Sequence, residues 1–400
     1  MPGTASPNLT PATIPATRIA IIVAVAHLIN DAYASVVPPL LPRIMDDLDL
    51  SIAAAATLGA SFAIATAIPQ PFFGYLADRF GRRIFAVGGV VTSAVFVSLI
   101  GFAPSFWPLL LMLVMGGLGG AAFHPPGASY AVRVGAGRGG GKRYSVFSFG
   151  GAVGYAAGPL VAVALVAWGG MKGLWVAMLP AVLFAPVLYR GLPSGRRETR
   201  GATPPPTPAA VLRRLAGPLG IIFGISATMA FVQRVFLTME PIIVADMGGS
   251  ETLGAAALSV YLGAQAFGTL TGGFLTDRVS RPRLLFHLCA WALPAHLLAV
   301  WLGPWTIAGM LATAAAGFLG MATLPPIVVM AQEMYPRAAG ASSGIVMGLA
   351  WAVGALGVMV TGAVADVTGP QAAALMSLPV AGFAALLALH PGLKYDDPGA

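Results

Sequence analysis

Charged residues are scarce in this sequence. Lys, Arg, Asp and Glu together make up 9% of the 400 residues, against about 25% in a typical soluble domain. Hydrophobic residues reach 57%, and the mean hydropathy is +0.83. A soluble protein of this size needs a charged exterior, so the composition excludes that class. The chain is therefore predicted to lie mostly in lipid.

Cysteine and the familiar catalytic motifs are also missing. The single cysteine, Cys289, excludes an intramolecular disulfide and a cysteine-based zinc site, and we expect it to be a small buried hydrophobe. The sequence has no G-x-x-x-x-G-K-[ST], H-E-x-x-H or G-x-S-x-G pattern. It offers no nucleophile–base set or metal cluster, so we expect neither an enzyme nor a metal or other cofactor.

Long apolar runs make up most of the chain. Stretches of about 20 apolar residues are long enough to cross a bilayer as helices. A charged, proline-rich segment at 192–214 divides the stretches into six and six, and is predicted to be a flexible cytoplasmic linker. We predict an all-α membrane protein with six-helix bundles at 1–191 and 215–400. The twelve predicted spans are 18–42, 51–76, 84–103, 106–132, 144–168, 172–191, 215–243, 252–276, 283–303, 305–332, 338–365 and 371–390.

Basic residues fall almost entirely on one side of these spans. If both termini are cytoplasmic, only Arg43 and Lys172 lie in outer segments and only Arg234 lies within a span, out of 22 Lys and Arg residues. Cytoplasmic segments of membrane proteins have such an excess of basic residues. The pattern predicts a multi-pass protein of the cytoplasmic (inner) membrane with both termini inside. It also explains the net charge of +8 without a nucleic-acid partner.

The two halves of the sequence repeat each other. GYLADR at 74–79 follows the second span, and GFLTDR at 273–278 follows the eighth. A nearly constant offset of about 200 residues indicates a duplicated six-helix unit, which is one known plan for transporters. Prolines follow the same offset, with Pro125-Pro126 matched by Pro325-Pro326 and Pro39 matched by Pro241.

The loop between the second and third spans has a specific motif. GYLADRFGRR at 74–83 fits the G-x-L-A-D-R-x-G-R-R signature of the major facilitator superfamily, and the chain resembles that family over nearly its whole length. Two further segments, AHLINDAYASVVPPLLP at 26–42 and AAFHPPGAS at 121–129, look like the fosmidomycin-resistance branch of its drug exporters. The resemblance implies a secondary active transporter that works by alternating access.

By this resemblance, the motif loop latches the two halves together on the cytoplasmic side when the carrier faces outward. The alternative is a positive-inside loop with a turn glycine. The second copy has Ser280 in place of the glycine, so we expect the first copy to matter more. The expected gating residues are Gly74, Asp78, Arg79, Gly81, Arg82, Arg83, Asp277 and Arg278.

Polar groups inside the spans are candidate substrate or proton sites, since a charge at the bilayer centre costs roughly 2.5–3.5 kcal/mol on insertion scales. His27, Asn30 and Asp31 in the first span lie on one helical face, and His124 lies at a comparable depth in the fourth span. The structural alternatives are that His27 only orients a neighbour and that His124 caps a broken helix.

The seventh span has an adjacent pair of polar residues, Gln233 and Arg234. The repeat offset places Asp31 of the first span onto Gln233, so we predict that Asp31 and Arg234 form a pair of opposite charges beside the central path. The alternative is a purely structural ion pair. Glu240 is expected near the outer end of the same span and Glu333 near the inner end of the tenth, each as a candidate for a solvated gate residue.

Prolines inside four spans predict helix breaks beside the substrate path, because each removes a backbone hydrogen bond. Tolerated kinks are the alternative. Gly154-x-x-x-Gly158-Pro159 resembles an antiporter signature, although small-residue packing is the default interpretation. The predicted break positions are Pro38, Pro39, Pro125, Pro126, Pro241, Pro325 and Pro326.

The leading functional hypothesis is a proton-coupled efflux antiporter for small anionic or amphipathic compounds, of the kind that gives antibiotic resistance. Arg234 and His124 would meet a negative group of the substrate, and Asp31 would take protons. The alternative is a proton-coupled importer of an organic anion or nutrient. A non-transporting membrane sensor is disfavoured because the sequence has no soluble signalling domain.

Overall fold

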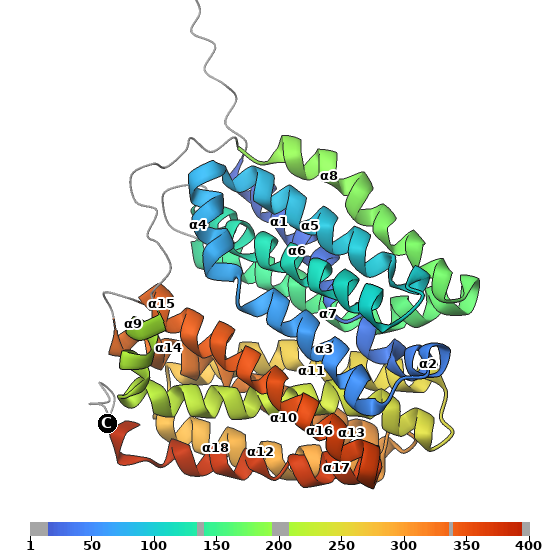
Figure 1. Cartoon of the computed structure of the whole chain (residues 1–400). Helices are drawn as coiled ribbons and strands as arrows, with labels where there is room; N and C mark the ends of the chain where they lie inside the picture. The colour runs from blue at the N-terminus through green and yellow to red at the C-terminus, as the bar shows by residue number, and fades with distance from the viewer. Residues whose placement is uncertain (1–14, 134–139, 194–207, 336–338, 394–400) are drawn as a thin grey trace, which may run out of the picture.

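The computed structural model describes residues 15–133, 140–193, 208–335 and 339–393. Within these ranges the secondary structure is entirely helical, and twelve helical segments are long and apolar enough to cross a membrane, as predicted. They form two six-helix halves, which occupy the upper and lower parts of Figure 1. Cys289 is fully buried, as expected.

The N-terminal half contains six spans. Its helices are α1 (Ala16–Ala34), α2 (Val37–Leu48), α3 (Ile52–Ala67), α4 (Gln70–Phe80), α5 (Arg82–Ser98), η1 (Ile100–Phe102), α6 (Phe106–Arg133), α7 (Gly140–Gly169), η2 (Met171–Met178) and α8 (Leu179–Gly191).

The C-terminal half contains the other six. Its helices are α9 (Pro208–Leu215), α10 (Pro218–Asp246), α11 (Glu251–Thr276), α12 (Arg281–Leu302), α13 (Ile307–Ala322), α14 (Leu324–Met334), α15 (Ala339–Gly344), the π-helical turn η4 (Ile345–Leu349), α16 (Ala350–Thr368), α17 (Pro370–Ser377), α18 (Val380–Ala388) and η5 (Pro391–Leu393).

The segment expected to be a flexible linker is partly helical. Residues 194–207 lie outside the described residues, but Pro208–Leu215 form helix α9. Proline at the first helical position has a suitable φ and loses no helix hydrogen bond, and Ala, Leu and Arg favour helix in the residues that follow. The second half therefore begins with a short helix before α10.

Prolines interrupt some spans and leave others continuous. Pro38-Pro39 lie in the first turn of α2 and Pro325-Pro326 in the first turn of α14, so the first and tenth spans each consist of two helices. The breaks predicted at Pro125-Pro126 and Pro241 are wrong, because α6 and α10 continue through them. Neighbouring helices can satisfy the backbone groups that a proline frees, so proline does not always end a membrane helix.

The helix turns define two sides of the bundle. We call the side with the α2–α3, α10–α11 and α16–α17 turns the distal side, and the side with the α4–α5 and α11–α12 turns the proximal side. The predicted topology makes the distal side extracytoplasmic. In Figure 1 α2 and α17 lie at the distal right, and α4 and α9 at the proximal left.

Helix α3 against α16, α7 against α11 and α2 against α10 form the main contacts between the halves. Small residues allow the helices to approach closely: a Cβ added to Gly362 of α16 would lie 2.7 Å from the Cβ of Ala56 on α3. Helix α4, the proximal half of the second span, packs instead against α5 and α6 of its own half.

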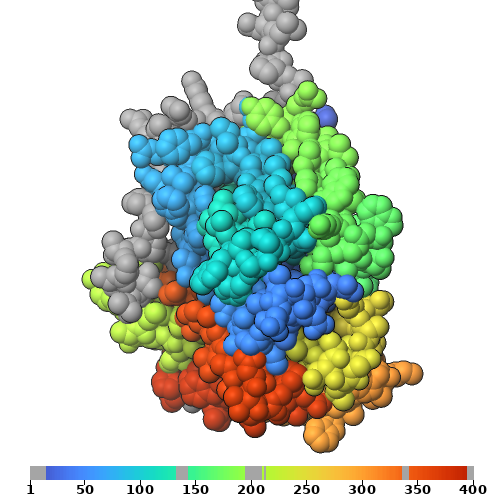
Figure 2. All heavy atoms as spheres, turned by 45° about the vertical axis from the view of Figure 1, so that its right-hand side comes forward, coloured from blue at the N-terminus to red at the C-terminus, as the bar shows by residue number. Residues whose placement is uncertain are grey.

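Charged contacts close the distal side. Arg43 of α2 forms an ion pair with Glu251 of α11 at 2.6 Å. The Asp366 carboxylate at the end of α16 accepts hydrogen bonds from the backbone N–H groups of Ile52 (2.7 Å) and Ala53 (3.2 Å), which begin α3. A carboxylate at a helix N-terminus satisfies free donors and stabilises the helix dipole. Figure 2 shows this side, where the blue α2–α3 turn lies against the yellow and red segments of the other half.

Replacing Asp366 is expected to open the distal side. Loss of a side-chain acceptor for free amides at a helix start costs about 0.5–2 kcal/mol, so Asp366→Ala should shift the equilibrium roughly 2- to 30-fold toward a distal-open state. The readout is the labelling rate of Thr238→Cys, in a Cys289→Ala background, with a maleimide; Thr238 is buried on α10 and lies near Gly59 of α3. Asp246→Ala, which alters an exposed carboxylate at the end of α10, is the control. Equal labelling rates for both variants would contradict the prediction.

Candidate transport site

Asp31 lies between two histidines in the N-terminal half. Its carboxylate Oδ2 is 3.0 Å from Nε2 of His27, one turn earlier on α1, and its Oδ1 is 3.1 Å from Nε2 of His124 on α6. The Asn30 side-chain amide donates to the same Oδ1 at 3.0 Å. The structure therefore brings together all four polar residues that the sequence analysis selected in the first and fourth spans.

Contacts with backbone carbonyl groups determine which ring nitrogen of His27 and of His124 carries a hydrogen atom. Nδ1 of His27 lies 2.8 Å from the carbonyl oxygen of Phe147, and Nδ1 of His124 lies 2.7 Å from that of Gly120. A carbonyl oxygen only accepts, so each Nδ1 must be the donor. In a neutral imidazole the Nε2 atom is then an acceptor, and so is the Asp31 carboxylate. Each Nε2–oxygen contact is thus favourable only when a proton lies between the two atoms.

Neighbouring helices fix the ring of His27. It stacks on Phe147 of α7 with the ring centroids 4.0 Å apart, and it lies directly over Gly151, where an added Cβ would be 2.4 Å from the ring. The side chains of His27, Asp31 and His124 are 11%, 19% and 25% exposed, so the cluster is enclosed but not sealed.

The same cluster is the part of the described chain most suited to a metal ion. One nitrogen or oxygen atom from each of His27, Asp31 and His124 lies within 4.8 Å of the others. Their direct nitrogen–oxygen distances of 3.0 and 3.1 Å are those of hydrogen bonds.

The predicted pairing of Asp31 with Arg234 is not present in this structure. The Arg234 guanidinium lies 5.7 Å from the ring centroid of Trp351 on α16, a cation–π contact within the C-terminal half. The Asp31 carboxylate instead contacts His27, Asn30 and His124, all in the N-terminal half. The repeat offset predicts equal depth in the membrane, but it does not determine which way each side chain points.

Polar groups of the C-terminal half line a small pocket. The Gln265 side chain of α11 donates to that of Gln233 at 2.9 Å, and Gln233 lines the pocket together with Trp351. The pocket lies at the break between α13 and α14, so the predicted break at Pro325-Pro326 does lie beside a cavity. Its other lining residues are Ser226, Met229, Ala230, Thr323, Leu324 and Ile327.

The motif loop makes its clearest contacts within the N-terminal half. Gly81 joins α4 to α5 with φ of +116°, which side chains other than glycine rarely adopt, so the turn predicted there is confirmed. Asp78 and Arg82 form an ion pair at 2.7 Å, and the Arg83 guanidinium lies 4.1 Å from the ring centroid of Tyr189 on α8. Arg79 donates to the hydroxyl of Tyr75. A latch between the halves belongs to the opposite conformation and stays a prediction.

The duplication also appears in the packing. A Cβ on Gly74 would lie 3.3 Å from that of Pro125, and a Cβ on Gly273 would lie 3.9 Å from that of Pro325. Each pair joins the second span of a half to its fourth. In the second motif copy, Asp277 ends α11 and Arg278 lies 3.4 Å over the Phe274 ring.

The two glutamates differ from each other in their surroundings. Glu333 lies near the proximal end of the tenth span and contacts Arg281. Glu240 was expected to be solvated, and this is wrong: the residue is only 1% exposed, and Phe236, one turn before it on α10, packs against Tyr261 of the same half. Sequence reasoning also missed Gln265 and the buried pair of Tyr261 and His296, although polar residues in apolar spans were a usable signal.

Comparison with known proteins gives the family. The family model of the Major Facilitator Superfamily matches residues 23–239 and 219–398. The chain belongs to the major facilitator superfamily. Its members are membrane transporters of small molecules, and the two overlapping matches together cover both six-helix halves of this transporter.

Relatives of this transporter include the uncharacterized MFS-type transporter YfnC of Bacillus subtilis (strain 168), 28% identical over 384 residues with 92% of each chain covered. The Fosmidomycin resistance protein of Escherichia coli (strain K12) is 26% identical over 357 residues, with 86% of each chain covered. The expected resemblance to that branch is thereby confirmed.

Solved structures share the fold. A bacterial homolog to the human lysosomal transporter Spinster, in an inward-facing and occupied conformation, has a TM-score of 0.77 at 18% identity, with 93% of this chain and 96% of that chain covered. A D-xylose-proton symporter has a TM-score of 0.70 at 18% identity, with 94% and 98% covered.

Adding a methyl group at Gly151 is expected to displace His27. A Cβ 2.4 Å from the imidazole forces the ring away, and overpacking of this kind costs roughly 1–3 kcal/mol. Gly151→Ala should therefore lower the melting temperature of the purified transporter, and much less so in a His27→Ala background. Gly169→Ala, at an open position on the same helix, is the control. An equal loss in both backgrounds would mean that Gly151 serves helix packing alone.

Proposed function

We propose that this transporter is a proton-coupled antiporter that exports small amphipathic or anionic compounds from the cytoplasm. The observation that supports the proposal best is that Asp31 lies between the Nε2 atoms of His27 and His124. Each of these two contacts is favourable only when a proton lies between the nitrogen and the oxygen. With Asp31 ionised, the cluster has a net charge of −1, 0 or +1 as it holds no, one or two protons. Proton binding thus changes the charge of the cavity that a substrate must share.

The two halves would divide the work. The N-terminal half offers the proton site, and the C-terminal half offers Arg234, Gln233 and the aromatic face of Trp351 to a substrate with a negative group and an apolar body. With the predicted topology, the closed distal side corresponds to an inward-facing state, in which a cytoplasmic compound would bind as the cluster gives up its protons. Similarity to the Fosmidomycin resistance protein supports export.

Import is the second candidate. The Probable 4-methylmuconolactone transporter of Cupriavidus pinatubonensis (strain JMP 134 / LMG 1197) is 28% identical over 270 residues, with 63% of this chain covered. A proton-coupled importer would use the same cluster, with substrate and protons moving in the same direction. The direction of coupling therefore decides between the two candidates.

Transport in inverted membrane vesicles tests the proposal. With the vesicle interior made acidic, fosmidomycin and a panel of amphipathic anions should accumulate inside, and a protonophore should abolish the accumulation. Vesicles with the Asp31→Asn variant serve as the control. Gradient-driven accumulation in right-side-out vesicles instead would favour the importer. Accumulation that is independent of the proton gradient in both vesicle orientations would reject proton coupling.

Removing titration from His124 is expected to remove the pH dependence of transport. His124→Gln keeps a hydrogen-bonding side chain but cannot change charge between about pH 5 and 8, where imidazole does. The variant should still bind the transported compound, with a transport rate that no longer follows pH over this range. His287→Gln, at an exposed histidine of α12, is the control and should behave as the unmodified protein. An unchanged pH profile in His124→Gln would return His124 to a structural role.

A further inference from the structure

Four polar residues of the C-terminal half form a buried chain of hydrogen bonds that leads from α12 to the pocket. His296 of α12 contacts the hydroxyl of Tyr261 on α11 at 3.0 Å. Gln265, one turn further along α11, contacts Gln233 of α10 at 2.9 Å. Tyr261 and His296 are fully buried, whereas Gln233 is 6% exposed and lines the pocket at the break between α13 and α14. This hydrogen-bond chain therefore connects the closed interior of the half with a cavity.

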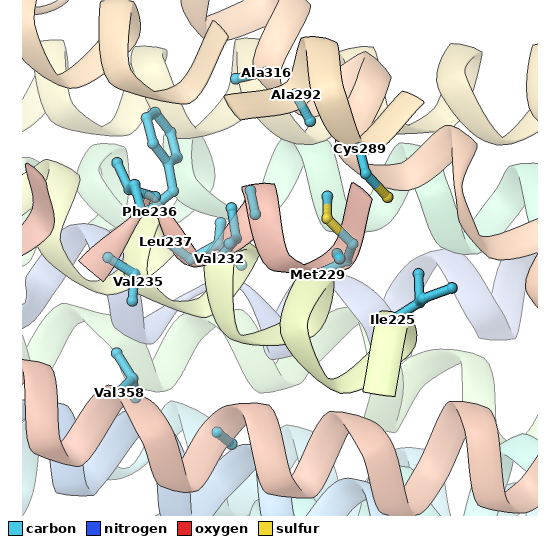
Figure 3. Packing of buried hydrophobic residues seen from close by; sticks show 14 of the residues in the cluster. Ile225, Met229, Val232, Val235, Phe236, Leu237, Cys289, Ala292, Ala316 and Val358 are labelled. Atoms are coloured by element: carbon cyan, nitrogen blue, oxygen red, sulfur yellow. The ribbon is translucent and has the colours of Figure 1, made fainter. Parts of the chain in front are cut away.

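Aromatic and apolar packing encloses the inner end of the hydrogen-bond chain. Phe236 of α10 stacks on the Tyr261 ring with the centroids 4.3 Å apart, and its centroid lies 6.0 Å from that of the His296 ring, edge to face. A Cβ added to Gly320 of α13 would lie 3.5 Å from the His296 ring and 3.8 Å from the Tyr261 hydroxyl. Figure 3 shows Phe236 in this part of the core, with apolar side chains of α10, α12 and α13 around it. The polar groups enclosed here must satisfy one another, because water does not reach them.

A backbone carbonyl group sets the direction of the first hydrogen bonds. Nδ1 of His296 lies 2.7 Å from the carbonyl oxygen of Ala292, so Nδ1 is the donor. A second proton on the ring would place a charge at a fully buried position, which is costly, so Nε2 has no hydrogen and accepts. The Tyr261 hydroxyl must therefore donate its one hydrogen to Nε2 of His296.

The same direction continues through the two amides. The Gln265 side chain is a second hydrogen-bond partner of the Tyr261 hydroxyl, which has already given away its hydrogen and can only accept. The NH₂ group of Gln265 is therefore the donor to Tyr261, and the same group donates to Oε1 of Gln233. The amide oxygen of Gln233 is thus used inside the half. Its NH₂ group, a donor, is what Gln233 offers to the pocket.

Charge beside the pocket favours the same kind of ligand. Arg234 follows Gln233 in the chain, and its guanidinium lies 5.7 Å from the ring centroid of Trp351, which also lines the pocket. The hydroxyls of Ser226 and Thr323 give their hydrogens to backbone carbonyl groups. Their oxygens could accept from a ligand, but a cationic donor would there meet the positive charge of Arg234.

We infer that the hydrogen-bond chain makes this pocket selective for the oxyanion end of a substrate, such as a carboxylate, over an amidinium or ammonium end. The three residues before Gln233 in the chain are positioning residues, since each acts on a substrate only through the Gln233 amide. The inference rests on the pocket as part of the substrate site in the proposed function, but not on proton coupling or on the direction of transport.

Equilibrium binding of two probes of nearly the same shape tests the inference without transport. Benzoate presents two hydrogen-bond acceptors and a negative charge, whereas benzamidine presents donors and a positive charge. Binding of each to the purified full-length transporter is measured by calorimetry at one neutral pH. The unmodified protein should bind benzoate at least about tenfold more tightly, since one hydrogen bond to a charged group changes affinity roughly 10- to 100-fold.

Replacing His296 tests where the direction comes from. His296→Leu removes the acceptor for the Tyr261 hydrogen, so the hydroxyl can donate to Gln265 and both amides can turn over. The ratio of benzoate affinity to benzamidine affinity should fall about tenfold or more, although the charge of the protein is unchanged. His296→Gln places an acceptor oxygen near the position of Nε2 and should keep most of the ratio. A merely structural role would weaken both probes together and leave the ratio as it is.

A pair of Tyr→Phe variants provides the matched control. Tyr261→Phe should lower the ratio, because Gln265 loses the oxygen to which it donates. Tyr33→Phe removes another buried hydroxyl, which donates to the backbone carbonyl of Ala177 in the N-terminal half, and should keep the ratio of the unmodified protein. An unmodified protein without a preference for benzoate would overturn the inference. So would an unchanged ratio in both His296→Leu and Tyr261→Phe.

Nitrogen NMR of isotope-labelled histidine gives a second readout that needs no probe. The ring signals that disappear in His296→Gln belong to His296, and they should show a protonated Nδ1 and an Nε2 without hydrogen. A protonated Nε2 would reverse every hydrogen bond of the chain and would overturn the inference. Neither measurement uses a proton gradient, so failure of the proposed export cycle would leave both results intact.

Discussion

The cost of placing polar groups in a membrane determines most of this structure. A bilayer supplies no hydrogen bonds, so every charge or polar atom inside the spans must find a partner in the protein. Asp31 finds two histidines, each held by a backbone carbonyl, and Arg234 finds the face of Trp351. Glu240 is an exception, because neither of its carboxylate oxygens has a hydrogen-bond partner among the described residues.

Duplication supplies a common frame, and the two halves use it differently. Ser51 and Ser250 cap the second and eighth spans at matching positions, and the Gly74–Pro125 contact corresponds to Gly273–Pro325. The polar residues do not match in this way. The N-terminal half has an acid between two imidazoles, whereas the C-terminal half has an amide pair and an arginine on an aromatic ring. The two halves thus share their packing, and the unshared polar groups give each half its own chemistry.

In the transport cycle that we propose, closure of the distal side is linked to the state of the central cluster. The Asp366 contact with the α3 amides and the Arg43–Glu251 pair must break before the distal side can open. These charge-assisted hydrogen bonds add to the packing of α3 against α16 and of α2 against α10. In the proposed cycle, proton binding can shift the balance only by as much as the two states differ in proton affinity.

The sequence by itself determined the twelve spans, the six-plus-six division, the glycine turn at Gly81 and the grouping of His27, Asn30 and Asp31, because these follow from hydropathy, periodicity and local backbone sterics. Only the tertiary structure decided which prolines break a helix, that Asp31 meets His124 instead of Arg234, and that Glu240 is buried. Each of these depends on how neighbouring helices rotate and pack about their axes. Local sequence determines which residues share a helix face, but the partner of that face is chosen by packing across the whole bundle.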